Sequence, residues 1–255
     1  MLKPHSNEWY DRLSETQDRY YYPWNSKLEP NHGEDNYIAI LKREIKKSHT
    51  VLDVGCGSGE ITNEIACLCK RVVGYDRLKR FIETANSNRQ DNATFLCYDP
   101  NQSDIGRIPI EGKCINYFVS SKGPLHWIPD AARIAEKNAK IIMLCPYVEA
   151  NYGWNEFLSP ELQYQGSNKN NLIETIQTHL RKIGSQIDQI EFYEAEETFF
   201  EQQEFIRFIT WGRFDLDIDL DGLQKSVKKI FQKYGKEDSL AIKYQRFIWR
   251  SNINN

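Results

Sequence analysis

The 255-residue chain lacks any long apolar run, and none approaches the roughly 18 residues that a membrane-spanning helix needs. Its N-terminus also lacks the charged-then-apolar pattern of a secretory signal. Internal repeats and low-complexity segments are missing too. We therefore expect a soluble, cytoplasmic protein with no membrane partner, built as one large α/β domain or as one domain with a substantial insertion.

A strong charge of either sign is also absent. The formal net charge is −3 and the pI is near 6, which argues against a sequence-independent nucleic-acid binder, so no nucleic-acid partner is expected. The six cysteines include no pair of C-x-x-C units, and no histidine cluster has zinc spacing, so no metal site is predicted. Reduced, mostly buried cysteines in a cytosolic protein are the favoured interpretation.

What the chain does contain is a glycine-rich turn at residues 51–60, Val-Leu-Asp-Val-Gly-Cys-Gly-Ser-Gly-Glu. Four residues, 51–54, are apolar enough for a buried strand apart from Asp53, and Ile61, Ile65 and Leu68 follow at helical spacing. A phosphate-binding P-loop would end in Gly-Lys-Ser/Thr, and a dinucleotide fingerprint would have a glycine at the position of Glu60. Neither pattern is present. The sequence predicts a strand, a tight glycine turn and a helix.

The remaining pattern, Asp-x-Gly-x-Gly-x-Gly, resembles the first motif of the class I S-adenosylmethionine (SAM) dependent methyltransferases. The resemblance implies SAM as the cofactor and S-adenosyl-L-homocysteine as its product. It also implies that the methionine end of SAM is held by the acidic position and the glycine loop, namely Asp53, Gly55, Cys56, Gly57 and Gly59. The alternative is a glycine turn that only joins a strand to a helix.

Three further strand ends carry residues that the resemblance assigns to the cofactor. Asp76 ends the predicted strand 71–76, where a carboxylate can accept hydrogen bonds from both ribose hydroxyls. Arg77 follows it, and Asp76 could instead cap a helix over 77–87. Tyr98 ends the predicted strand 93–98 and Asp99 follows it, at the position that the resemblance assigns to adenine binding. Asp99 could instead start a turn before a proline. Ser120 follows the next predicted strand and is also assigned to the cofactor.

A second resemblance covers Leu-His-Trp-Ile-Pro-Asp at residues 125–130, which looks like the loop after strand four in the trans-aconitate methyltransferase-like branch. That loop lines the site of methyl transfer in the branch. His126 is the side chain there with a pKa suited to proton transfer near neutrality, although it could equally pack or cap. Arg213, Arg207 and Lys122 are the candidates for placing a carboxylate substrate. Arg213 is favoured because it follows Gly212, whereas solvated surface charge is the simpler interpretation of Arg207 and Lys122.

The fold class expected from the resemblance is α/β. It is a seven-stranded, mostly parallel, doubly wound sheet with an antiparallel last strand and helices on both faces. The predicted strands are 51–54, 71–76, 93–98, 114–119, 140–147, 187–193 and 240–249. The predicted helices include 34–47, 77–87, 171–183, 201–211 and 221–234.

Residues 1–33 are expected to form an aromatic N-terminal lid, with Trp9, Leu13 and Tyr20 on one helix face that ends by Pro23. Residues 34–255 would form the methyltransferase domain, with substrate-cap segments inserted at about 148–170 and 201–238. Tyr21, Trp24, Trp127 and Tyr147 are the predicted substrate-facing lid residues.

The sequence thus favours transfer of a methyl group from SAM to a small molecule, at a carboxylate or a hydroxyl oxygen, by in-line displacement. Two alternatives stay open at this stage. One is a methyltransferase of RNA or protein, and the other is a SAM-binding module without catalysis.

Overall fold

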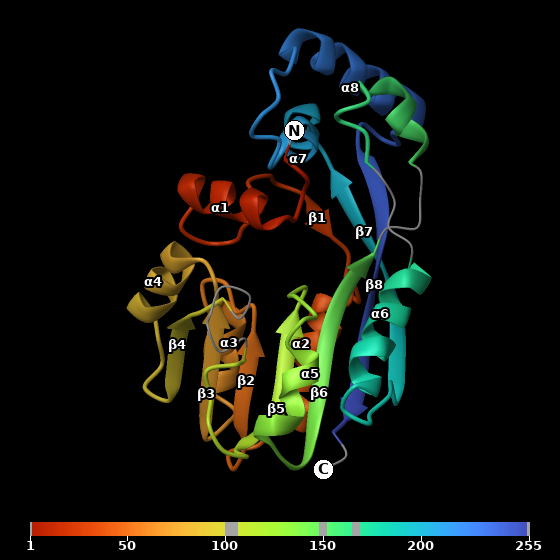
Figure 1. The fold of residues 1–255 in the computed structure, drawn as a ribbon. Coiled ribbons are helices and arrows are strands. Elements are labelled where there is room, and N and C mark those ends of the chain that lie inside the picture. The colour runs from red at the N-terminus through yellow and green to blue at the C-terminus, as the bar shows by residue number, and fades with distance from the viewer. Residues whose placement is uncertain (1, 100–106, 148–151, 165–168, 254–255) are drawn as a thin grey trace.

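The computed structural model describes residues 2–99, 107–147, 152–164 and 169–253, and its centre is a twisted eight-stranded sheet (Figure 1). The strand order is β1-β7-β8-β6-β5-β2-β3-β4. The strands are β1 (Lys27–Leu28), β2 (Thr50–Val54), β3 (Arg71–Asp76), β4 (Ala93–Cys97), β5 (Ile115–Ser121), β6 (Ala135–Tyr147), β7 (Gln189–Phe199) and β8 (Leu240–Asn252).

Strands β2 to β6 pair in parallel, so their carboxyl ends meet at one edge of the sheet. Strand β8 inserts antiparallel between β6 and β7. Successive strands are added to the sheet in two directions from β2: β3 and β4 lie on one side, and β5 and β6 lie on the other. An open α/β sheet binds its ligands at such a topological switch point. The arrangement therefore points to the loops after β2 to β5 as the site.

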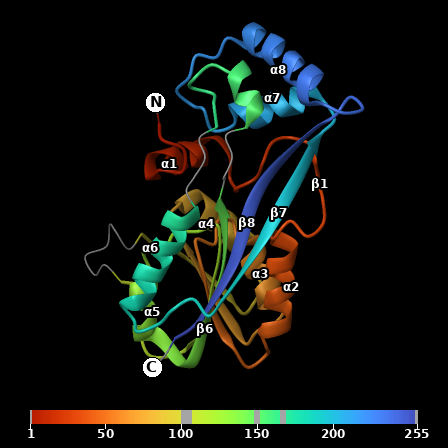
Figure 2. The same ribbon diagram turned by 90° about the vertical axis from the view of Figure 1, so that its right-hand side faces the viewer.

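Helices cover both faces of the sheet (Figure 2). On one face, α2, α3 and α4 pack over a core that includes Tyr37 and Val51, and on the other, α5 and α6 pack over Leu52 and Phe118. The helices are α1 (Asn7–Thr16), α2 (Glu34–Glu44), α3 (Glu60–Ala66), α4 (Lys79–Ser87), α5 (Ile128–Ile134), α6 (Lys169–Arg181), α7 (Gln202–Thr210), α8 (Leu220–Tyr234) and the 3₁₀ helix η1 (Gly153–Phe157). A parallel strand that is covered by helices on both faces has apolar residues at nearly every position. The largely apolar 51–54 run fits this environment, and it forms a central strand.

Beyond the carboxyl edge, β7 and β8 continue past the sheet and carry η1, α7 and α8, which we call the outer cap (Figures 1 and 2). It has a hydrophobic core of its own, around Trp154, Phe205 and Val227. The first helix, α1, lies between the sheet edge and the outer cap, so segments from the two ends of the sequence meet over the same edge (Figure 1).

The fold class is confirmed, with two differences in detail. The sheet has eight strands rather than seven, because Lys27–Leu28, within the expected N-terminal lid, pairs antiparallel with Thr198 and Glu197 of β7. The N-terminal helix ends at Thr16, so Tyr20 is not on its face as predicted. Tyr20 instead packs against Trp211 of the outer cap, with ring centroids 5.6 Å apart. No helix in the described parts of the chain has the length and apolarity to cross a membrane.

Candidate functional site

A cavity of about 780 Å³ lies at the carboxyl ends of β2 to β5, covered by the N-terminal segment that includes α1. Many of the residues predicted from sequence line it together. They are Tyr21, Asp53, Gly55, Cys56, Gly57, Asp76, Arg77, Tyr98, Asp99 and His126. The cavity is therefore the candidate site for cofactor and substrate.

The glycine loop takes a backbone conformation that side chains disfavour. Gly55, Gly57 and Gly59 have φ values of 69°, 54° and 85°. A Cβ at Gly57 would meet nothing within 4 Å, so this backbone is open for a ligand to lie against it. Gly59 is not among the lining residues. A Cβ there would come within 2.7 Å of the Phe95 ring, so this glycine serves close packing of the loop on β4.

Asp76 is held by backbone donors on both sides. Its Oδ2 accepts from the Gly57 N–H at 3.0 Å and its Oδ1 from the Leu78 N–H at 2.9 Å. Burial raises the pKa of this carboxyl, while the backbone hydrogen bonds work in the opposite direction. Asp76 thus orders both the glycine loop and the start of α4, and it lines the cavity. A carboxylate fixed in this way suits a ligand with two hydroxyl donors.

Asp53 lies inside β2 and is only 2% exposed. The Thr62 hydroxyl donates to its Oδ2 at 2.6 Å, and burial raises the pKa of this carboxyl to about 7. A carboxyl whose pKa is close to neutral pH loses its proton more readily when a cationic group binds near it, here above the glycine loop.

The loop after β5 is shaped by close contacts. The Ser120 hydroxyl, fully buried, donates to the Val54 carbonyl at 2.7 Å and so ties β5 to β2 rather than lining the cavity. A Cβ at Gly123 would come within 2.7 Å of that same carbonyl. Trp127 is buried, stacks on Phe118, and donates to the Pro124 carbonyl at 2.8 Å. Trp127 therefore supports the loop that presents His126.

The N-terminal segment forms the roof of the cavity with Tyr10, Arg19, Tyr20 and Tyr21. Burial raises the pKa of Tyr20 well above its usual range, so the Tyr20 hydroxyl stays protonated. Burial also lowers the pKa of His126, which keeps its imidazole neutral near pH 7. A neutral imidazole and hydroxyl groups thus face the cavity, and the imidazole is the one that can accept a proton.

The lining also holds residues that sequence reasoning did not assign to the site, among them an ion pair. Lys122, expected to be a solvated charge, lines the cavity with its Nζ 2.6 Å from Oε1 of Glu34. Glu34 begins α2 and was read only as part of an amphipathic helix. Their positions, 34 and 122, carry no local signal, because the fold alone brings α2 and the β5 loop together.

Besides Gly59, Ser120 and Trp127, three further predicted residues lie apart from the described lining. Trp24 is in the outer-cap cluster and donates to Glu197 at 2.8 Å, and Tyr147 packs on Phe247 at the end of β6. Arg213 follows Gly212 in the turn after α7.

Comparison with known proteins agrees with this geometry. Residues 51–142 match a family model described as a methyltransferase domain. The putative methyltransferase 235L of invertebrate iridescent virus 6 is 25% identical over 138 residues, which cover 51% of each chain. The chain spans about half or less of the length of the curated relatives that it matches.

Solved structures share the fold. A functionally unknown protein from Deinococcus radiodurans R1 superposes with a TM-score of 0.68 at 16% identity, over 97% of this chain and 100% of that one. A putative methyltransferase from Bacillus halodurans C-125 gives a TM-score of 0.57 at 15% identity, over 86% and 99%.

The family match falls on the strands, the glycine loop and the acid-tipped β3 that build the cavity floor. Residues 51–142 therefore match a methyltransferase domain, and S-adenosyl-L-methionine is the cofactor that fits this match and the cavity.

Proposed function

We propose that this protein transfers the methyl group of SAM to a small-molecule acceptor, at a carboxylate or a hydroxyl oxygen. One observation carries the proposal. One cavity is lined by Asp76 and the glycine loop together with His126, Lys122 and the tyrosines of the N-terminal segment.

The size and cover of the cavity favour a compact acceptor. Its volume of about 780 Å³ falls in the range of small-molecule sites, and the cofactor would take a large share of it. The roof is joined to the core where Arg77 donates to Oδ1 of Asp11 at 2.8 Å and Arg80 donates to the Ser14 and Glu15 carbonyls at 2.9 Å. A polymer would have to displace this segment, whereas a small metabolite fits beneath it.

When bound, SAM supplies an electrophilic methyl group on a sulfonium, so the protein mainly has to orient the reacting pair and exclude water. Asp76 would hold the ribose hydroxyls, and Tyr98 and Asp99 would flank the adenine. Tyr10, Tyr20 and Tyr21 would cover the reacting centre with ring surface. The acceptor oxygen takes the methyl carbon, and the electron pair of the broken S–C bond stays on a neutral thioether.

The need for a base depends on the acceptor. A carboxylate is already ionised and needs none. A hydroxyl must lose its proton, and His126, neutral and lining the cavity, would accept it. The similarity of the 125–130 segment to the trans-aconitate methyltransferase-like branch favours the carboxylate.

The proposal is tested with SAM that carries a radiolabelled methyl group. Purified protein is incubated with this SAM and a cell extract, which is then separated into low-mass, protein and RNA fractions. Label in the low-mass fraction is expected, and its release by mild base would identify a methyl ester. Label confined to protein or RNA would overturn the small-molecule acceptor, and binding of SAM without any transfer would favour a non-catalytic module.

A further inference from the structure

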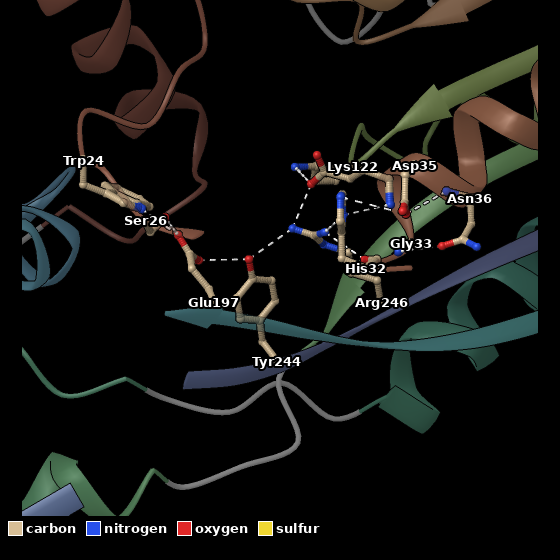
Figure 3. Close-up of polar contacts among 11 residues, drawn as sticks. Trp24, Ser26, His32, Gly33, Asp35, Asn36, Lys122, Glu197, Tyr244 and Arg246 are labelled. Carbon is tan, nitrogen blue, oxygen red and sulfur yellow. Dashed lines mark hydrogen bonds and ion pairs between the residues drawn. The ribbon is translucent and has the colours of Figure 1, made fainter. Parts of the chain in front are cut away.

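A cluster of three charged residues, partly buried, lies at the cavity wall, and its polar contacts are drawn in Figure 3. Lys122 and Arg246 both bind the same oxygen of Glu34: Nζ of Lys122 is 2.6 Å and an Nη of Arg246 is 2.8 Å from Oε1. Lys122 and Glu34 line the cavity, whereas Arg246, on β8, is 4% exposed and lies behind them. The three charges come from α2, the β5 loop and β8.

The cluster is fixed from behind by further hydrogen bonds. Arg246 donates to the His32 carbonyl at 2.9 Å and to the Tyr244 hydroxyl at 3.3 Å. That hydroxyl donates to Glu197 at 3.0 Å, and Glu197 also accepts from Trp24 (Figure 3). Arg246 therefore acts as a positioning residue, because it holds Glu34 in one orientation without lining the cavity.

The two lining residues keep bonding capacity on the cavity side. A lysine ammonium has three N–H donors, and only one is directed at Glu34 Oε1. Among the described parts of the chain, none contributes a hydrogen bond to the other oxygen of Glu34, Oε2. The wall thus presents a cation and an anion side by side. This pattern is complementary to a zwitterion, in which a carboxylate and an ammonium are also adjacent.

The position of this pair along the sheet identifies which zwitterion it meets. From one side of the site to the other, the strand ends carry Asp99 after β4, Asp76 at β3, the glycine loop after β2, and Lys122 after β5. Three strand spacings separate β4 from β5, roughly 14 Å. A cofactor with its adenine near Asp99 and its ribose on Asp76 would therefore extend its amino-acid end across the glycine loop toward Lys122 and Glu34.

We propose that Lys122 and Glu34 bind the amino-acid end of the cofactor, with Lys122 taking its carboxylate and Glu34 taking its ammonium. The assignment rests on the proposed function. It adds two side chains to a site for which the sequence indicated only Asp53 and the glycine loop.

Both groups carry their charges at neutral pH. Burial works to raise the pKa of Glu34, but Lys122 and Arg246 outweigh it and lower that pKa. Burial works to lower the pKa of Lys122, and Tyr22 and Glu34 outweigh it and raise that pKa. The pair therefore offers fixed charges rather than a proton acceptor, which suits binding.

Two commercially available ligands separate this contact from the rest of the site. S-adenosylhomocysteine has the amino-acid end, whereas 5′-methylthioadenosine keeps the adenosine and the sulfur and lacks it. Calorimetry measures both dissociation constants for the wild type, for Lys122→Met and for Glu34→Gln. We expect each substitution to weaken S-adenosylhomocysteine about tenfold to a hundredfold, as for loss of a charge-assisted hydrogen bond, and to leave 5′-methylthioadenosine unchanged within about threefold.

Unchanged binding of 5′-methylthioadenosine also shows that each variant is folded. Lys225→Met, an exposed lysine on α8, is the matched control and should alter neither constant. If Lys122→Met or Glu34→Gln loses both ligands equally, or neither, the assignment is overturned while the SAM site stands. Failure of the wild type to bind S-adenosylhomocysteine would instead overturn the proposed function itself.

Discussion

The indole N–H of Trp9 donates to the carbonyl of Gly212 at 2.7 Å, which joins the first helix to the turn after α7. Trp9 is 2% exposed and packs edge-to-face on Trp211, at 5.2 Å between ring centroids. Gly212 has a φ of 71°, and a Cβ there would come within 2.4 Å of the Trp9 ring. The roof of the cavity is thus attached to the outer cap at a point where only glycine fits.

Substitution of Gly212 by alanine should therefore destabilise the protein through two effects, the left-handed backbone and the clash with Trp9. The backbone effect alone is worth about 1–2 kcal/mol, and the clash adds about 1–3 kcal/mol. Gly184→Ala is the matched control, because its φ is 67° and nothing lies within 4 Å of its Cβ position. Thermal unfolding of both variants measures the difference. Equal losses would show that the Trp9 contact does not hold the roof.

Asp76→Asn should weaken the binding of S-adenosylhomocysteine tenfold or more. The amide replaces one acceptor oxygen by a donor, which opposes either the Gly57 or the Leu78 N–H and removes an acceptor for the ribose hydroxyls. Calorimetric titration measures the change, with the exposed Asp91→Asn as control. A wild-type affinity in Asp76→Asn would exclude Asp76 from the ribose site.

Asp53 should make the unliganded protein less stable as the pH rises. Its pKa is about 7 in the folded protein and about 3.9 in the unfolded chain, so between these values the folded state binds more protons. The free energy of unfolding should then fall with a slope of up to about 1.4 kcal/mol per pH unit from this group, and level off above pH 7.

The Asp53→Asn variant tests this. It removes the titration, so guanidinium unfolding of the unliganded variant should show a flatter dependence between pH 4 and 7 and a higher stability than the wild type at pH 8. Parallel pH profiles for the two proteins would contradict the assignment of this titration to Asp53.

Arg80 should control the local opening of α1. Its guanidinium donates to the Ser14 and Glu15 carbonyls at the C-terminal end of the helix, where positive charge also favours the helix dipole. Loss of about 1–2 kcal/mol in Arg80→Gln should speed amide exchange in residues 7–16 by roughly tenfold and leave β2 and β3 unchanged. Hydrogen exchange with mass spectrometry measures this. Lys79→Gln, which removes an ammonium that pairs with Glu83 at 3.8 Å, should show no such acceleration.

The parts of the fold that were predictable have local causes. The 51–60 turn combines a buried strand, glycines and a helix within ten residues, and Asp76 follows one helix and one strand later, so pattern and spacing suffice. Strand β1 was not predictable, because two residues have no periodicity and Lys27–Leu28 is a strand only through its partner β7.

The Lys122–Glu34–Arg246 cluster was equally out of reach. Its members are far apart in the sequence, and each has an ordinary local role: a helix start, a loop cation and a strand residue. Only the insertion of β8 beside β6 brings Arg246 behind Glu34. Side-chain chemistry that depends on strand order cannot be read from windows of a few residues.

The continuous pairing of β7 with β8 has a mechanical consequence. The ladder runs from Gln189 and Arg250 in the sheet to Phe199 and Leu240 at the outer cap without a register shift. A continuous ladder of this kind couples the outer cap to the sheet, so we expect the outer cap to stay fixed relative to the cavity floor. The N-terminal segment, joined by side-chain hydrogen bonds and the two-residue β1, is then the wall that moves. If its opening limits product release, turnover will slow as solvent viscosity rises.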